Sequence, residues 1–162
     1  MKQQIQKRTV QKQSDSETIF LAGLISGVLD GIAASVVFNI KLGLTPGQVM
    51  QYIASAVYGT DAFKGGAYTI IIGTALHFII AFAAAAIFLY AYPKIKLLRS
   101  NTVSTGLAFG LGIWLFMNFL IVPITKIQPA PFNAMAALIS AIWHMVLVGL
   151  PIALIVKKRF SR

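Results

Sequence analysis

The sequence predicts an all-α membrane protein: a four-transmembrane-helix bundle with one short interfacial helix in the first outer loop. Four long apolar runs support this prediction, because a helix of about 20 apolar residues crosses the hydrocarbon core of a bilayer. The second run, residues 67–92, contains one imidazole and no residue with a fixed charge. Only 11% of the 162 residues are charged, against about 25% in soluble domains. The composition therefore predicts a single domain embedded in the lipid bilayer.

The net charge of +10 would indicate a nucleic-acid partner in a soluble protein. Here the Lys and Arg side chains lie between the apolar runs, where such residues set membrane orientation. We therefore expect no nucleic-acid partner. The sequence contains no cysteine, which excludes disulfides, thiolate metal sites and cysteine nucleophiles.

The first span is expected at residues 18–40, after a basic N-terminal arm of residues 1–17. Ser14 and Glu17 have the spacing of a capping box immediately before the apolar run. Small residues recur at every fourth position of the span, and such a stripe lets a neighbouring helix approach closely in lipid; they are Gly23, Gly27 and Gly31. This stripe predicts helix packing, either within the chain or against a second copy in a homo-oligomer.

A short amphipathic helix is expected in the connection at 41–66. Thr45 and Pro46 indicate its first turn, and apolar residues follow at helical spacing. The helix is too short to cross a bilayer, so we expect it at the outer interface or as a plug at the end of the bundle.

The remaining elements are three further spans and a basic tail, at about residues 67–92, 102–123, 133–156 and 157–162. Pro93 ends the second span. The third span contains Gly106 and Gly110, which are again typical of helix packing. Pro151 is expected to bend the fourth span, because proline frees a backbone carbonyl.

The basic residues indicate the orientation of the chain. Eleven of the fourteen Lys and Arg residues lie in the N-terminal arm, the turn at 93–101 and the C-terminal tail. With four spans, these segments fall on one face of the membrane, and the positive-inside rule places that face in the cytoplasm. We therefore predict that both termini are cytoplasmic.

Three ionisable residues lie near the middle of three different spans: Asp30, His77 and His144. Asn118 is the further member of this polar intramembrane set and lies a turn or more closer to the outer face. Such residues are costly in hydrocarbon and are expected to face the bundle interior in pairs. One interpretation is a structural cluster that fixes helix packing.

Three other interpretations of the polar set stay open. Asp and His side chains at the midplane are typical of proton or ion pathways. His77 and His144 could instead hold haem b between two helices of the bundle. The same histidines with Asp30 are also suitable ligands for zinc or iron. We expect no resident cofactor, with haem b as the alternative.

Enzymatic motifs are missing from the chain, which has no HExxH, no GxSxG and no phosphate-binding loop. Only one of its four acidic residues lies within a predicted span. We therefore expect a non-enzymatic membrane protein whose interior polar cluster is structural or proton-responsive.

Several short segments resemble a known family. They are His77 with the run Phe78–Ala86, the turn Pro93-Lys94-Ile95-Lys96-Leu97, Pro123, the loop Pro129-Ala130-Pro131-Phe132, and His144. Over about residues 67–150 the chain resembles the YagU-like family of small bacterial inner-membrane proteins, whose function is not established. The resemblance implies a multi-pass protein of the bacterial inner membrane. It implies no catalytic residue.

Overall fold

The computed structural model describes residues 14–128 and 131–161, and every regular element among them is helical. Four helical stretches of 23 to 28 residues are long and apolar enough to cross a membrane, which confirms the predicted number of spans. The first and second spans are single helices, α1 (Asp15–Leu42) and α3 (Gly66–Ala91). The third and fourth are each built from three consecutive segments: α5 (Thr102–Phe116), η2 (Met117–Ile121) and α6 (Val122–Ile124), then α7 (Ala134–Trp143), η3 (His144–Gly149) and α8 (Leu150–Phe160).

Capping residues set the ends of the first span. The Ser14 hydroxyl accepts the Glu17 backbone N–H at 3.1 Å, and the Glu17 carboxylate accepts the Ser14 N–H at 2.8 Å. This capping box starts α1 at Asp15, three residues before the predicted span. Gly43 ends the helix with a φ of 69°, a left-handed conformation that suits glycine.

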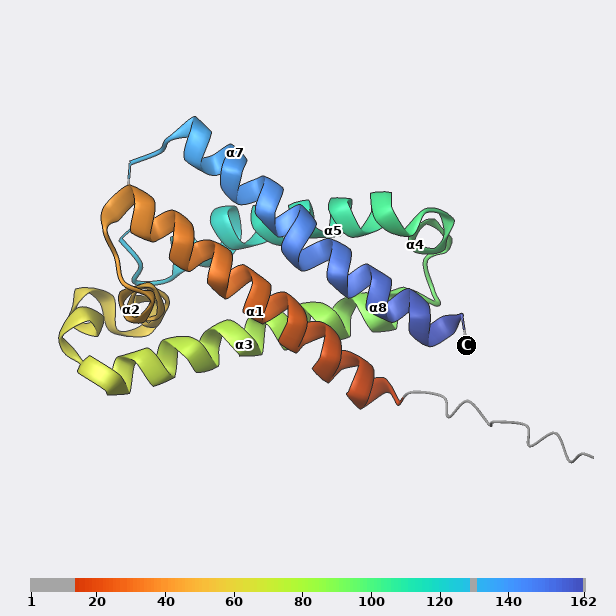
Figure 1. Ribbon diagram of the computed structural model, residues 1–162, viewed down its shortest axis with the longest axis horizontal. Coiled ribbons are helices and arrows are strands. Elements are labelled where there is room, and N and C mark those ends of the chain that lie inside the picture. The colour runs from red at the N-terminus through yellow and green to blue at the C-terminus, as the bar shows by residue number, and fades with distance from the viewer. Residues whose placement is uncertain (1–13, 129–130, 162) are drawn as a thin grey trace, which may run out of the picture.

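The two ends of the bundle are formed by different elements (Figure 1). The start of α1, the end of α8 and the short helix α4 (Lys96–Ser100) lie at one end, where Arg159 pairs with Asp15 at 3.0 Å. α2 (Pro46–Tyr58) lies at the other end (Figure 1). α1 packs along α3 on one side and along the fourth span on the other, and α5 packs against the fourth span.

The packed core lies toward the end of the bundle that contains the start of α1 and the end of α8, which we call the terminal end. Phe88 and Leu89 of α3 meet Ile152 and Val156 of α8, and each of the four side chains is at most 2% exposed. Small residues fill the remaining contacts, chiefly alanines of α1, α3 and α8. Large apolar side chains outside this core cover the surface of all four spans, as expected for helices that face lipid.

At the opposite end, α2 and the 3₁₀ turn η1 (Gly59–Lys64) fold back against α3. Gln51 is buried and donates to the Thr69 hydroxyl and the Gly66 carbonyl, both at 3.3 Å. Gly73 of α3 packs directly on the Met50 carbonyl, where a side chain would collide with the backbone. The predicted short helix is therefore present and anchored to α3, and its placement at the membrane interface stays a prediction.

The glycine stripes are used within the chain. A Cβ atom on Gly23 would collide with the Phe82 ring, and one on Gly27 would lie 2.8 Å from the Phe78 ring, so both glycines form the contact between α1 and α3. In the third span, Gly106 and Gly110 pack against the backbone of the fourth span. An interface between two copies of the chain would have to use another surface.

Candidate functional site

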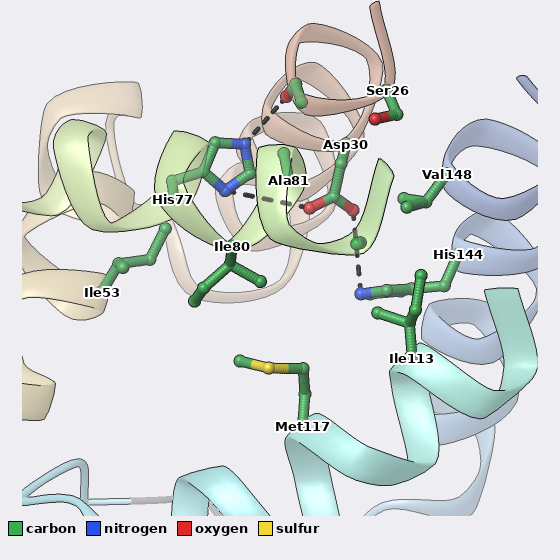
Figure 2. Close-up of a pocket in the computed structure, with 12 residues that line it drawn as sticks. Ser26, Asp30, Ile53, His77, Ile80, Ala81, Ile113, Met117, His144 and Val148 are labelled. Carbon is green, nitrogen blue, oxygen red and sulfur yellow. Dashed lines mark hydrogen bonds and ion pairs between the residues drawn. The ribbon is translucent and has the colours of Figure 1, made fainter. Parts of the chain in front are cut away.

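The Asp30 carboxylate lies between two imidazoles in the middle of the bundle (Figure 2). Its Oδ2 atom is 3.9 Å from Nδ1 of His77, and its Oδ1 atom is 3.8 Å from Nε2 of His144. The three side chains are 20%, 11% and 16% exposed, respectively. α1, α3 and η3 each contribute one of them. Both distances exceed the range of direct hydrogen bonds.

The second nitrogen of each ring donates to a backbone carbonyl. Nε2 of His77 is 2.8 Å from the Gly27 carbonyl, and Nδ1 of His144 is 2.7 Å from the Ser140 carbonyl. Because a carbonyl oxygen only accepts, these two nitrogens must bear the hydrogens. The nitrogens that face Asp30 therefore carry lone pairs when the rings are neutral. Each of the two nitrogen–oxygen pairs then consists of two acceptors.

The glycine stripe makes the first of these bonds accessible. Gly27 brings α1 close enough to α3 for His77 to reach its carbonyl, and Gly31 leaves that carbonyl uncovered on the next turn. A Cβ atom on Gly31 would lie 3.5 Å from Nε2 of His77, which is an ordinary contact. A side chain is therefore tolerated less well at Gly27 than at Gly31.

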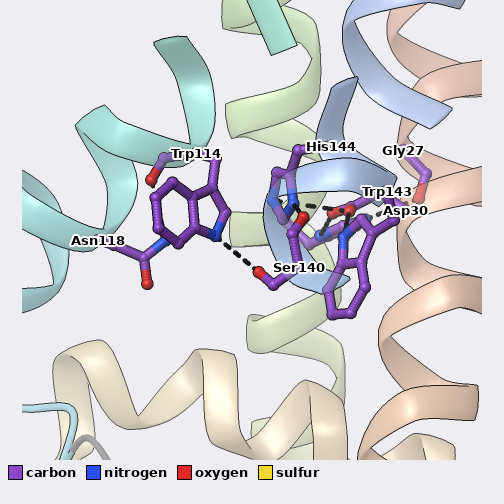
Figure 3. A network of polar contacts seen from close by, with 8 residues as sticks. Gly27, Asp30, Trp114, Asn118, Ser140, Trp143 and His144 are labelled. Carbon is purple, nitrogen blue, oxygen red and sulfur yellow. Dashed lines mark hydrogen bonds and ion pairs between the residues drawn. The ribbon is translucent and has the colours of Figure 1, made fainter. Parts of the chain in front are cut away.

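Two tryptophans support the site from the fourth and third spans (Figure 3). Nε1 of Trp143 donates to Oδ1 of Asp30 at 2.9 Å, which gives the carboxylate its shortest contact. Nε1 of Trp114 donates to the Ser140 hydroxyl at 2.7 Å, and the carbonyl of that same serine accepts from His144. A chain of polar contacts thus joins α5 to α1 through the fourth span.

Asn118 does not join this cluster, although the sequence interpretation grouped it there. Its side chain is exposed and its Nδ2 donates to the Trp114 carbonyl at 2.9 Å, one turn back on its own helix (Figure 3). The reason lies in the backbone: the third span widens into the π-helical segment η2 at this point. The Trp114 carbonyl accepts the Met117 backbone N–H at this point, and the Asn118 amide adds a second donor to it.

The fourth span has the same irregularity, and there it forms part of the site. His144 begins the π-helical segment η3 and bonds the carbonyl four residues earlier. Each π segment ends two residues before a proline, Pro123 or Pro151. Proline cannot donate to the preceding turn and its ring crowds that carbonyl, so the helix widens to relieve the contact. The bend expected at Pro151 is thus a widened turn.

A cavity of about 180 Å³ adjoins the three ionisable groups. Asp30, His77 and His144 line one side, and Ile53, Ile80, Ile113 and Met117 line the other (Figure 2). A volume of this size holds several water molecules or one ligand the size of benzene. The polar cluster therefore borders open space inside the bundle.

The ring orientations do not fit a haem iron held between the two histidines. Nε2 of His77 is bonded to the Gly27 carbonyl, and the Asp30 carboxylate lies between the rings. Ligation by both would require one ring to turn and the carboxylate to move aside. Among the described residues, no group of three or more His, Asp or Glu side chains is arranged to hold a metal ion.

The fold and this site define a four-span helical protein with a carboxylate and two imidazoles in its interior. No family model, curated protein or solved structure matches the chain. The resemblance to the YagU-like family therefore stays a prediction, neither supported nor contradicted by these comparisons.

Proposed function

We propose that the chain is a non-enzymatic, multi-pass membrane protein whose Asp30, His77 and His144 form a proton-binding site inside the bundle. One observation supports this most strongly: each imidazole uses one nitrogen to donate to a carbonyl and directs the other at its own oxygen of Asp30. One added proton turns a contact between two acceptors into a donor–acceptor contact. Proton uptake is therefore the change that this arrangement responds to most directly.

The groups around the site favour this response. In the described part of the chain, the Asp30 carboxylate accepts one hydrogen bond, from Nε1 of Trp143. The other helices at the cavity contribute Ile53 from α2, Ile113 from α5 and Met117 from η2, none of which titrates. Of the described residues that line the cavity, the carboxylate and the two rings are thus the groups that can bind a proton.

The apolar layers on either side support an occluded site in preference to an open channel. Toward the terminal end, Phe88, Leu89 and Ile152 are almost fully buried between the cavity and the basic residues. Toward the other end, α2 covers the bundle and Ile53 lines the cavity. Conduction of protons or ions would need one of these layers to open, so we propose a proton-responsive protein first and a conductor second.

Location and orientation follow from the charges. Lys157, Lys158 and Arg159 end the last helix, at the same end of the bundle as the basic helix α4. We propose that this end faces the cytoplasm of a bacterial inner membrane. A reporter fused to the C-terminus should be active only in the cytoplasm, and periplasmic activity would refute the orientation.

Nitrogen NMR of histidine-labelled protein tests the proton site, because the chain contains two histidines. The His144→Gln variant retains His77, which should be neutral with its hydrogen on Nε2. The His77→Gln variant retains His144, which should carry its hydrogen on Nδ1. Acidification should protonate the other nitrogen in each case.

Asp30→Asn tests whether the carboxylate affects proton uptake by the two imidazoles, and Asp61→Asn is the matched control. Asp61 lies outside the spans and pairs with Lys64 on the surface. Removing Asp30 should change the pH at which both rings take up protons, whereas removing Asp61 should not. The proposal would be overturned if both single-histidine proteins had the same tautomer. It would also be overturned if replacing Asp30 left proton uptake by the rings unchanged.

A further inference from the structure

We propose that the interior cavity binds a small primary ammonium ion, R–NH₃⁺, in exchange for a proton. The occupant would place its ammonium group among Asp30, His77 and His144 and its apolar group against the opposite wall. The exchange rests on the proton-binding role proposed above for the same three side chains. It adds the chemical class of a ligand, which proton binding alone does not require.

The polar wall offers acceptors to an occupant. With neutral rings, Nδ1 of His77 and Nε2 of His144 present lone pairs, and Asp30 adds Oδ2 and a negative charge. The nearest donor, Nε1 of Trp143, already bonds Oδ1 of the carboxylate. No Lys or Arg side chain lines the cavity in the part of the chain that the structure describes. A group with several N–H donors and one positive charge complements this wall, and a primary ammonium has three such donors.

The distances suit one nitrogen atom shared between neighbouring acceptors. Separations of 3.8 and 3.9 Å are too long for a direct hydrogen bond. A nitrogen at about 2.8 Å from both atoms of such a pair is geometrically allowed, because twice that radius exceeds the separation. A single ammonium group can therefore bridge the carboxylate and an imidazole without movement of the helices.

The remaining walls of the cavity determine which organic group R the ammonium ion can carry. Ile53, Ile80, Ile113, Met117 and Val148 are all apolar and surround the space beyond the three acceptors. Ser26 also lines the cavity, but its hydroxyl donates to the Gly23 carbonyl and carries no charge. A second charged group, as in a diamine or an amino acid, would therefore find no oppositely charged partner among the described lining residues. A volume of about 180 Å³ accommodates a short alkyl chain or one ring.

Proton binding and ammonium binding exclude one another at this wall. Protonating either ring turns an acceptor into a donor that points at the ammonium group, and protonating Asp30 removes the attracting charge. Among the described residues, no other titratable side chain lines the cavity, to which α2, α5 and η2 contribute Ile53, Ile113 and Met117. One bound cation therefore replaces one proton, with no change in the net charge of the site.

Equilibrium dialysis of radiolabelled n-butylammonium against the full-length protein in uncharged detergent micelles tests this exchange. At about pH 8 the amine is charged, as a Lys side chain is with its pKa of about 10.4. We expect saturable binding to one site. Unlabelled n-butanol, which matches the shape without the charge, and tetramethylammonium, which has the charge without N–H donors, should compete about tenfold less well than butylammonium. Lowering the pH to about 5.5 should release the amine.

Protein variants separate the site from adsorption to the micelle. Asp30→Asn should weaken binding about tenfold or more, whereas Asp61→Asn makes the same charge change outside the spans and should leave it unchanged. Ile113→Trp narrows the cavity and keeps all three acceptors, so it should also weaken binding even if Asp30→Asn does not fold. Equal competition by butanol, or equal binding by the two Asp variants, would overturn the inference.

The histidine titration on the same preparation distinguishes the two proposals. Rings that take up protons in a manner dependent on Asp30, without any saturable amine binding, would refute the ammonium site alone. Rings that titrate independently of Asp30 would refute the proton site, and the exchange would fail with it.

Discussion

The contact between α5 and η3 leads to a sharp prediction, because two glycines on the same helix differ in what surrounds them. A Cβ atom on Gly110 would collide with the His144 carbonyl and lie 2.6 Å from Cα of Met145. Carbon atoms in contact prefer about 3.5–4.0 Å, so the two backbones must separate by about 1 Å. Gly112 has open space around its Cβ position. Gly110→Ala should therefore destabilise the bundle and Gly112→Ala should not.

The comparison of the two variants isolates the steric effect. Both add one methyl group to α5, so the gain in helix propensity of about 1 kcal/mol is common to both. Overpacking against rigid backbone costs about 1–3 kcal/mol. For a chain of this length each kcal/mol corresponds to about 2–4 °C in the midpoint of thermal unfolding. A cost of about 2 kcal/mol thus predicts that Gly110→Ala unfolds about 4–8 °C below Gly112→Ala.

Thermal unfolding in detergent micelles, followed by far-ultraviolet circular dichroism, measures this difference. The displaced backbone belongs to His144, so Gly110→Ala should also weaken the bond from its ring to the Ser140 carbonyl. Nitrogen NMR of the His77→Gln background would detect that change as a loss of the Nδ1–H tautomer. Equal midpoints for the two alanine variants would refute the packing described for this helix pair.

Three further predictions address α1, α2 and the haem alternative. Gly27→Ala should lower the unfolding midpoint more than Gly31→Ala, because its Cβ atom would lie 2.8 Å from a ring while the other makes an ordinary contact; similar midpoints would contradict the close approach of α1 and α3. Gln51→Leu should cost about 1–2 kcal/mol by removing two donated bonds, and should increase protease access to α2 without changing histidine titration. Protein purified from haem-replete cells should show no Soret band, and a band lost on replacing either histidine would refute this.

Hydrophobic length predicted most of the fold, because a bilayer requires long apolar helices whose backbone bonds are satisfied internally. The four spans and the short helix starting at Pro46 follow from that requirement and from local capping. The three ionisable residues were predicted near one depth from their positions along the helices. The structure brings Asp30 within 4 Å of both His77 and His144.

The sequence did not predict how each helix is rotated about its own axis. Apolar residues surround α3 on all sides, so periodicity does not identify the face that points inward. The bond from Trp143 to Asp30 and the choice of nitrogen in each ring depend on that rotation. Trp143 was noted for its depth alone, and no local signal linked it to a residue more than a hundred positions away.

The π segments were also missed, although the sequence contains a signal for them. A proline follows each segment by two residues, and a side chain with an N–H donor lies at its first or second position: His144 in one and Asn118 in the other. A proline alone predicts a kink. The combination with a donor that can reach the preceding turn indicates a widened turn.

The widened turn in the fourth span has a geometric consequence for the site. His144, Val148, Ile152 and Val156 are spaced by four residues, and in a regular α-helix each such step overshoots a full turn by about 40°. Over three steps that drift would carry the imidazole about 120° away from the buried face of α8. A π turn rotates less per residue, so it offsets part of the drift between His144 and Val148. The same face can then present His144 to Asp30 and Ile152 to the packed core, which makes the irregular backbone a condition for the site.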